Sequence, residues 1–236
     1  MPNMVKKEER FRHIIILLIF GGCLFFWQYG ITRFLLSHFY FEQGRNLNKK
    51  ASAIPDAYLA KKAVLYKRSL LSIIHSLKLT PFNPQLLVAY ADMLSAIAED
   101  PYLCKIIELE SGGIKTKDNL GFFYEKAQRL YRKAVFFEPT NPEYHLKLAT
   151  VYDKLGKTQK AQEELSRAAA LGANNATVYL FIVRYYLAKG DEAKFNYYLE
   201  EMIKIGNRLG LCGGGPMADI VLPFLKEIGK EGMLKR

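Results

Sequence analysis

Residues 142–175 decide the fold, and they read PEYHLKLATVYDKLGKTQKAQEELSRAAALGANN. Apolar side chains recur in this stretch at three- and four-residue spacing with almost no β-branched alternation, which predicts amphipathic helices. The sequence Glu-Pro-Thr-Asn-Pro at 138–142 precedes the stretch, and a near-copy, Thr-Pro-Phe-Asn-Pro, stands at 80–84. A third breaker, Gly-Ala-Asn-Asn at 172–175, begins about 34 residues after the one at 138–142. Breakers at a fixed period indicate stacked helical hairpins, so we expect an all-α fold.

The same stretch resembles a tetratricopeptide repeat (TPR). It has that repeat's length of 34 residues and suitable side chains at seven of the family's positions, namely Leu148, Ala149, Tyr152, Gly156, Ala161, Leu165 and Ala168. Ala149 and Ala161 are small where the two helices of a hairpin would cross, and Gly156 permits a tight turn between them. Ala173 stands where the family usually has a helix-ending proline, which is a departure. The resemblance implies an α-α superhelical, TPR-like solenoid.

Neighbouring units extend the predicted solenoid over residues 55–206. The unit that begins at Ala176 keeps the register of the unit before it, with Tyr179, Ile182, Tyr186, Gly190, Leu199 and Met202 in place. The unit upstream is split by an insertion at 99–120, and a still earlier second helix is indicated at 67–79 without a well-defined first helix. Because a solenoid exposes the apolar face of its last repeat, we expect residues 207–236 to form a glycine-rich linker and a capping helix.

The N-terminal part of the chain is typical of a membrane anchor. Residues 14–31 read IIILLIFGGCLFFWQYGI, in which only Gln28 is strongly polar. A helix of this length is about 27 Å long, close to the hydrocarbon thickness of a bilayer, and Trp27 and Tyr29 stand where an interfacial aromatic belt would lie. We therefore predict a short basic tail at 1–13, a single transmembrane helix at 14–36 and a juxtamembrane linker at 37–54.

Two processing signals compete with the anchor. A cleaved secretory signal would need a small-x-small site soon after the apolar run, and residues 51–53 lie too far downstream. A lipoprotein signal is loosely matched by residues 20–23, but Phe20 replaces the usual leucine and the chain stays apolar after Cys23. Lysine and arginine flank both ends of the helix, so their balance does not set the orientation. A tail this short usually stays inside, which favours a non-cytoplasmic soluble domain, periplasmic in a bacterium.

The positive charge of the chain is concentrated after the anchor. The formal net charge is +11, and residues 32–83 hold nine Lys/Arg against two acidic residues. A bilayer with acidic headgroups is the nearest anionic partner for this excess, since each basic group near such a surface contributes about 1 kcal/mol. Nucleic acid is the weaker interpretation of such a patch, so no nucleic acid is expected as a partner.

The three cysteines show no spacing that predicts a disulfide framework or a zinc site. A bridge between Cys104 and Cys212 stays open if the domain faces an oxidising compartment, although two unpaired thiols are the simpler interpretation.

Residues with the spacing of a catalytic or metal site are not found. The glycine run at 213–215 lacks the strand and the Lys-Ser/Thr pair of a phosphate-binding loop. The four histidines have neither metal-ligand spacing nor acidic companions, and no Ser, Cys or Thr stands in a nucleophile motif. We therefore expect a protein that is not an enzyme and needs no metal or other cofactor and no small-molecule substrate. An enzyme site built from the insertion and the glycine linker is the third and weakest hypothesis.

The resemblance also implies a partner-binding groove, because the first helix of each TPR hairpin lines the concave face. The outward positions predict a groove formed by Glu143, Lys147, Thr150, Lys154, Thr177, Phe181 and Arg184. An ordinary solvated helix face is the competing interpretation for each of them. Family members that hold a C-terminal carboxylate need Lys and Asn where this chain has Leu146 and Thr150, so that ligand is not carried over. Such a groove would suit an extended peptide with acidic and apolar side chains.

Two functional hypotheses follow from an anchor joined to repeats. The first is a membrane-anchored TPR-like scaffold that binds partner proteins or peptides and assists assembly of a membrane or envelope complex. The alternative is a structural bitopic subunit whose transmembrane helix makes the key contacts, for which Gly21 and Gly22 offer a small-residue surface. A repeat solenoid is reused for unrelated tasks, so the fold restricts the function only to this class.

Overall fold

The computed structural model describes the backbone of residues 2–100, 119–208 and 218–228. Side chains are described within these ranges from residue 20 onward, except at 56, 119, 120, 218–220 and 222. Every regular element of the described ranges is a helix, and the chain divides into two compact units, Met1–Leu86 and Leu87–Arg236. Residues 101–118 of the predicted insertion, and with them Cys104 and also Cys212, lie outside the described residues.

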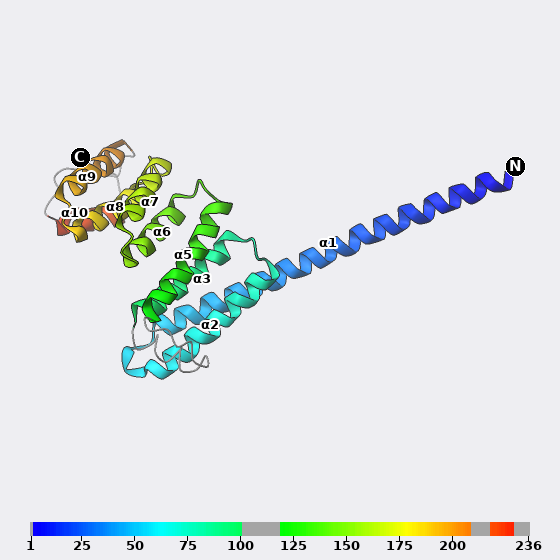
Figure 1. Ribbon diagram of the computed structural model, residues 1–236, viewed down its shortest axis with the longest axis horizontal. Helices are drawn as coiled ribbons and strands as arrows, with labels where there is room; N and C mark the ends of the chain where they lie inside the picture. The colour runs from blue at the N-terminus through cyan, green and yellow to red at the C-terminus, as the bar shows by residue number, and fades with distance from the viewer. Residues whose placement is uncertain (1, 101–118, 209–217, 229–236) are drawn as a thin grey trace. The chain divides into compact units, whose positions relative to one another are not determined.

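The first unit is a long helical hairpin. Helix α1 spans Pro2–Ser52, a short 3-10 helix (η1) spans Asp56–Tyr58, and α2 spans Leu59–Leu79. Figure 1 shows α2 running back alongside the C-terminal part of α1. The segment 37–54, expected to be a linker, is thus almost entirely helical and supplies a partner for the helix that the sequence indicated at 67–79.

Small side chains bring α1 and α2 close together. Ser37, Gly44 and Ala51 are buried on α1 at seven-residue intervals, which places them on one face of the helix. A Cβ atom at Gly44 would lie 2.8 Å from Cγ1 of Ile73. Hydroxyl groups take up the hydrogen-bonding capacity of this close contact, since Ser69 donates to the Gly44 carbonyl oxygen at 2.6 Å. The hairpin is therefore held by close backbone approach and serine hydrogen bonds in addition to apolar packing.

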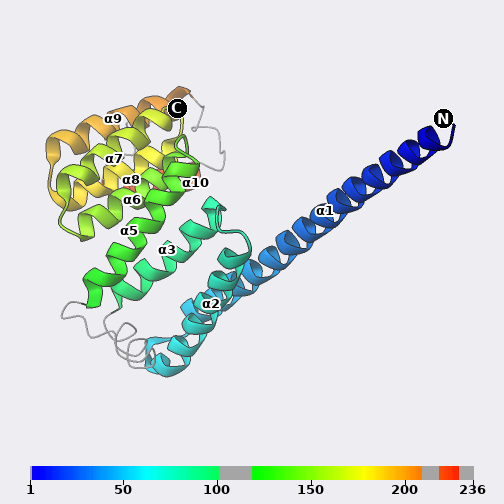
Figure 2. The same cartoon turned by 45° about the vertical axis from the view of Figure 1, so that its right-hand side comes forward.

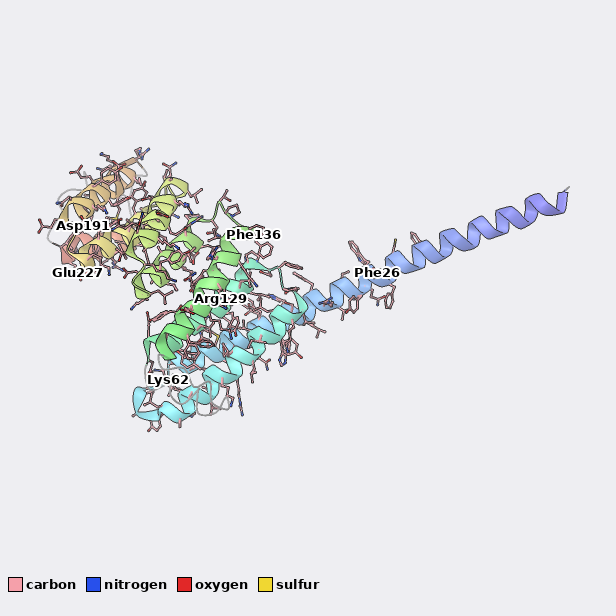
Figure 3. All side chains as sticks on the ribbon, viewed as in Figure 1. Phe26, Lys62, Arg129, Phe136, Asp191 and Glu227 are labelled. Atoms are coloured by element: carbon pink, nitrogen blue, oxygen red, sulfur yellow. The ribbon has the colours of Figure 1, made fainter. Side chains whose placement is uncertain are left out.

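The part of α1 that precedes its contact with α2, residues 20–36, is called the bare part here, and it carries large apolar side chains on its surface. Trp27 and Phe26 are 71% and 74% exposed, and Figure 3 labels Phe26 on this stretch. Among the helices whose side chains are described, none has a stretch both long and apolar enough to cross a membrane. The side chains of residues 14–19, the first part of the predicted anchor, lie outside that set.

The second unit is a stack of helical hairpins. It comprises most of α3 (Pro84–Glu99), then α5 (Asn119–Phe137), α6 (Pro142–Lys154), α7 (Thr158–Leu171), α8 (Ala176–Lys189), α9 (Glu192–Arg208) and α10 (Ala218–Glu227). Consecutive helices from α5 to α9 contact one another, and α6 also contacts α8, as Figure 2 allows the reader to follow. Leu165, Ile182 and Met202 are fully buried in a core formed by residues of α6 to α10.

The last helix lies within the segment predicted to cap the solenoid. Val221, Phe224 and Leu225 of α10 are buried and belong to the core cluster of the second unit. Helix α10 contacts α8, whose apolar surface would otherwise face water.

The turns of the repeats recur at the predicted period. Gly156 and Gly190, 34 residues apart in sequence, have φ values of 71° and 69° and end α6 and α8 in the left-handed region. At Gly156 the turn is closed by Lys157 N–H donating to the Tyr152 carbonyl oxygen at 2.8 Å. The predicted tight turn at Gly156 is therefore confirmed, and its backbone conformation favours glycine.

We expect Gly156→Ala to lower the free energy of unfolding of the α6–α7 hairpin by about 1–2 kcal/mol, because a Cβ is strained at positive φ. Amide hydrogen exchange of α6 and α7 measures this change. Gly121→Ala in α5 is the matched control, since its added Cβ meets nothing within 4 Å and no positive φ constrains it. Equal exchange rates in the two variants would contradict the assigned turn.

Candidate functional site

A cleft opens between the N-terminal halves of α6 and α8. Its volume is about 550 Å³. Leu146 and Val178 are buried beneath it, and the Phe181 ring is 39% exposed at its wall. The other lining residues are polar or lie at the helix starts: Asn141, Pro142, Glu143, Lys147, Asn175 and Thr177. The cleft thus combines an apolar interior with a polar rim, which is the usual character of a binding site.

Two asparagine caps determine where the walls of the cleft begin. The Asn141 side chain accepts from the Glu143 backbone N–H at 3.1 Å, and that of Asn175 accepts from Thr177 N–H at 3.0 Å. Each cap satisfies a backbone donor that the first turn of the helix leaves unpaired. Because the caps occupy equivalent repeat positions, the first turns of α6 and α8 begin at corresponding points and face the cleft from its two sides.

Polar contacts join the two helices at their other ends. The Tyr185 hydroxyl donates to Asp153 Oδ1 at 3.0 Å, and Lys189 Nζ lies 2.8 Å from the same oxygen. Burial, together with the Asp153 carboxylate, raises the pKa of Tyr185, so the phenol stays protonated as a donor. These contacts tie α6 to α8 at their C-terminal ends and leave the N-terminal halves to form the cleft.

Four of the seven predicted groove residues line the cleft: Glu143, Lys147, Thr177 and Phe181. The other three make contacts elsewhere. The Thr150 hydroxyl donates to the Leu146 carbonyl oxygen at 3.0 Å, and Lys154 Nζ lies 3.8 Å from a Glu99 oxygen. The Arg184 guanidinium lies 5.3 Å from the centre of the Phe224 ring, where it packs on α10.

Asp92 of α3 neutralises the lysine of the cleft. Lys147 Nζ lies 2.8 Å and 2.9 Å from the two Asp92 carboxylate oxygens, and the Tyr131 hydroxyl donates to the same carboxylate. Burial is the main cause of the raised pKa of Tyr131, and Asp92 adds to it. Sequence reasoning missed Asp92, although it is the ninth residue of α3, the position that Thr150 occupies in α6. The pairing makes the cleft less cationic than its lysine suggests.

A second polar cluster lies buried between α6 and α7. Nδ1 of His145 is 2.6 Å from Glu164 Oε2, and Nε2 is 3.0 Å from the Pro139 carbonyl oxygen. Arg167 donates to the other Glu164 oxygen at 2.8 Å. His145 and Glu164 are only 4% and 7% exposed, so neither is accessible to a substrate. This cluster joins the α5–α6 turn to α7 and has a structural role.

In the described part of the chain, no group of three or more His, Cys, Asp or Glu side chains is placed to hold a metal ion.

Comparison with known proteins bears on the fold. No protein-family profile matches the chain. Among solved structures, a monomeric IFIT1 mutant with Gppp-AAAA is 18% identical with a TM-score of 0.52, and the match covers 72% of this chain and 37% of that chain. A MamA structure is 16% identical, covers 73% of this chain and 97% of MamA, and has a TM-score of 0.42, too low to support an argument. The IFIT1 match, at this identity, shows a TPR-like helical-repeat fold and nothing about ligands.

Proposed function

We propose that this protein is a membrane-anchored scaffold that holds an extended segment of a partner protein in the α6–α8 cleft. The observation that carries the proposal is the cleft itself, about 550 Å³ in volume, with Phe181 half-exposed at its wall. Aromatic side chains are enriched among the hot spots of protein interfaces. Helical-repeat folds present such concave surfaces to other polypeptides.

The contacts of the cleft favour an apolar side chain as the anchor of the bound segment. Leu146, Val178 and Phe181 supply the apolar surface. Lys147 is paired with Asp92 and lies 3.7 Å from Glu143, so it offers little uncompensated positive charge to an acidic peptide. We therefore expect apolar contacts to provide most of the binding energy, with the polar rim orienting the peptide backbone.

The proposal predicts a specific cross-link at Phe181. A photoreactive phenylalanine analogue at position 181 should form an adduct with a discrete protein in membranes of the native host. The same analogue at Phe136 of α5, which is 79% exposed and does not line the cleft, is the matched control. We further expect Phe181→Ser to reduce partner binding at least tenfold, as loss of a hot-spot aromatic does, and Phe181→Leu to preserve most of it. Indistinguishable adducts at positions 181 and 136 would exclude the cleft as the binding site.

The anchoring half of the proposal rests on the exposed apolar surface of α1. Large side chains around the helix, among them Phe25, Phe26 and Trp27, are more than two-thirds exposed, and a bilayer is the environment in which such a surface is stable. We propose that the segment 14–36 inserts in the membrane, with the repeats on its non-cytoplasmic side.

The structural-subunit alternative is favoured by Gly21 and Gly22 on the exposed part of α1. A Cβ atom at either glycine would meet nothing within 4 Å, so another helix has room to approach there. Replacement of residues 14–36 by an unrelated anchor separates the two functions. Retained partner cross-linking at position 181 supports the scaffold. Loss of the cross-link, together with loss of the membrane complex that contains this protein, supports specific helix packing.

A further inference from the structure

The C-terminal end of α2 marks the level at which α1 leaves the hairpin. The Ser37 hydroxyl lies 2.6 Å from the Thr80 hydroxyl, and the Arg33 guanidinium donates to the Lys78 carbonyl oxygen at 3.4 Å. The turn after α2 therefore lies beside residues 33–37 of α1. Between residues 20 and 36 of α1, every residue is exposed except Gly22 and Arg33, which are partly buried. The geometry defines a hairpin foot, consisting of Arg33, Lys78 and Phe82.

Exposed aromatic rings are present both on the bare part of α1 and at the hairpin foot. Phe82 is 74% exposed in the turn between α2 and α3. Tyr29, 53% exposed on α1, lies beneath the Arg33 guanidinium, which is 5.4 Å from its ring centre. Aromatic rings beside cationic groups are typical of the interface between the hydrocarbon core and water. The exposed ring of Phe82, near residues 33–37 of α1, would also be stable at this interface.

The charge of the foot is uniformly positive. The sequence has no Asp or Glu between Glu9 and Glu42, and none between Asp56 and Asp92. Arg33 and Lys78 are thus free of nearby acidic neighbours in their own helices. Two other basic residues of the hairpin, Lys49 and Lys50, lie far from the foot, in the last turn of α1. That turn is about 24 Å from Arg33 along the helix, more than twice the screening length of about 10 Å.

We propose that the hairpin foot is a second membrane contact, in which Phe82 enters the interfacial layer while Arg33 and Lys78 bind acidic lipid headgroups. This inference rests on the proposed insertion of α1, and it assigns the lipid contact to two of the nine basic residues of segment 32–83. Two contacts, the inserted helix and the foot, fix the angle of the α1–α2 hairpin to the bilayer surface. A single inserted helix leaves that angle free.

The experiment uses the single tryptophan of the chain, Trp27, and full-length variants in which it is moved. Wild type is reconstituted in vesicles of phosphatidylcholine and phosphatidylglycerol with brominated acyl chains, and quenching of Trp27 reports insertion of α1. In Trp27→Phe/Phe82→Trp, the new tryptophan should be quenched by lipids brominated near the headgroup more than by lipids brominated deep in the chain. Trp27→Phe/Tyr58→Trp is the control, since Tyr58 is 63% exposed at the opposite end of α2, about 30 Å away.

Charge variants test the acidic headgroups. In the chain with tryptophan at 82, Lys78→Gln should lower the ratio of docked to undocked foot about fivefold, because one basic group is lost from the surface. Lys61→Gln, near the other end of α2, should leave the ratio unchanged. Vesicles of phosphatidylcholine alone should give weaker quenching at position 82 than mixed vesicles.

The outcomes separate this inference from the anchoring on which it rests. Quenched Trp27 with no quenching at position 82 overturns the foot contact and leaves the anchor intact. Unquenched Trp27 in a chain that fails to float with the vesicles overturns both. Equal quenching at positions 82 and 58 also overturns the foot contact, because it shows no preferred end of the hairpin.

Discussion

Replacing Glu164 with leucine is expected to lower the free energy of unfolding of the α6–α7 hairpin by about 3 kcal/mol near pH 6, because it leaves the buried His145 imidazolium without its carboxylate. Both His145 ring nitrogens face acceptors, at 2.6 Å and 3.0 Å, so the doubly protonated ring satisfies both contacts. Hydrogen exchange of α6 and α7 amides gives the free energy of local opening in the intact chain.

The effect of Glu164→Leu should depend on pH. Hydrogen bonding to Glu164 is the main cause of the raised pKa of His145, and burial and Arg167 oppose it. A histidine with a raised folded-state pKa adds stability that is complete below about pH 6.5, its unfolded-state value, and is lost as pH rises through the folded-state pKa. The difference between wild type and variant should therefore be largest below about pH 6.5 and shrink as the pH rises through the folded-state pKa of His145.

Glu163→Leu is the matched control for this prediction, since Glu163 is exposed on the same helix. It should change the opening free energy by less than about 0.5 kcal/mol at any pH in this range. The double variant His145→Leu/Glu164→Leu should recover most of the lost stability, because it removes both buried charges. A Glu164→Leu effect that is independent of pH would show that His145 is not protonated in the folded state.

Replacing Gly44 with leucine is expected to separate α1 from α2 and to lower the opening free energy of α2 by about 3 kcal/mol. An added Cβ would lie 2.8 Å from Ile73 Cγ1 and 3.2 Å from the Ser69 carbonyl oxygen, and backbone cannot move aside as a flexible side chain can. The hydrogen bond from Ser69 to the Gly44 carbonyl oxygen would also be lost. Exchange of the α2 amides in a mild detergent measures the change.

Gly30→Leu is the control on the same helix. Nothing lies within 4 Å of the Cβ position at Gly30, so leucine there should leave α2 exchange unchanged or slow it slightly through higher helix propensity. Similar acceleration of α2 exchange in both variants would mean that Gly44 does not limit the approach of the two helices.

The repeats were predictable because their information is local. The turn at Gly156 needs a residue that tolerates positive φ. Asn141 and Asn175 cap the helices that follow them by accepting from backbone N–H groups two residues ahead. The resemblance to the TPR predicted Glu143 and Thr177 at the second position of α6 and α8 and Lys147 and Phe181 at the sixth, and these four residues line one cleft. Each of these features depends on neighbours within a few residues or on one repeat.

The α1–α2 hairpin was not predictable in the same way. Segment 37–54 resembles a linker because the residues on its contact face, Ser37, Gly44 and Ala51, contribute no apolar periodicity. These small residues allow α1 and α2 to approach closely, but on their own they do not predict that another helix packs there.

Local chemistry along the chain thus sets the helices, their caps, their tight turns and the spacing of the repeats, because those depend on side chains close in sequence. The three-dimensional packing decides which partners the charged side chains contact. Lys147 meets Asp92 across 55 residues of sequence, and Arg184 packs on Phe224 of the last helix rather than on the cleft. Such pairings depend on how separate hairpins stack, since residues that are distant in sequence become neighbours only when the helices between them have packed.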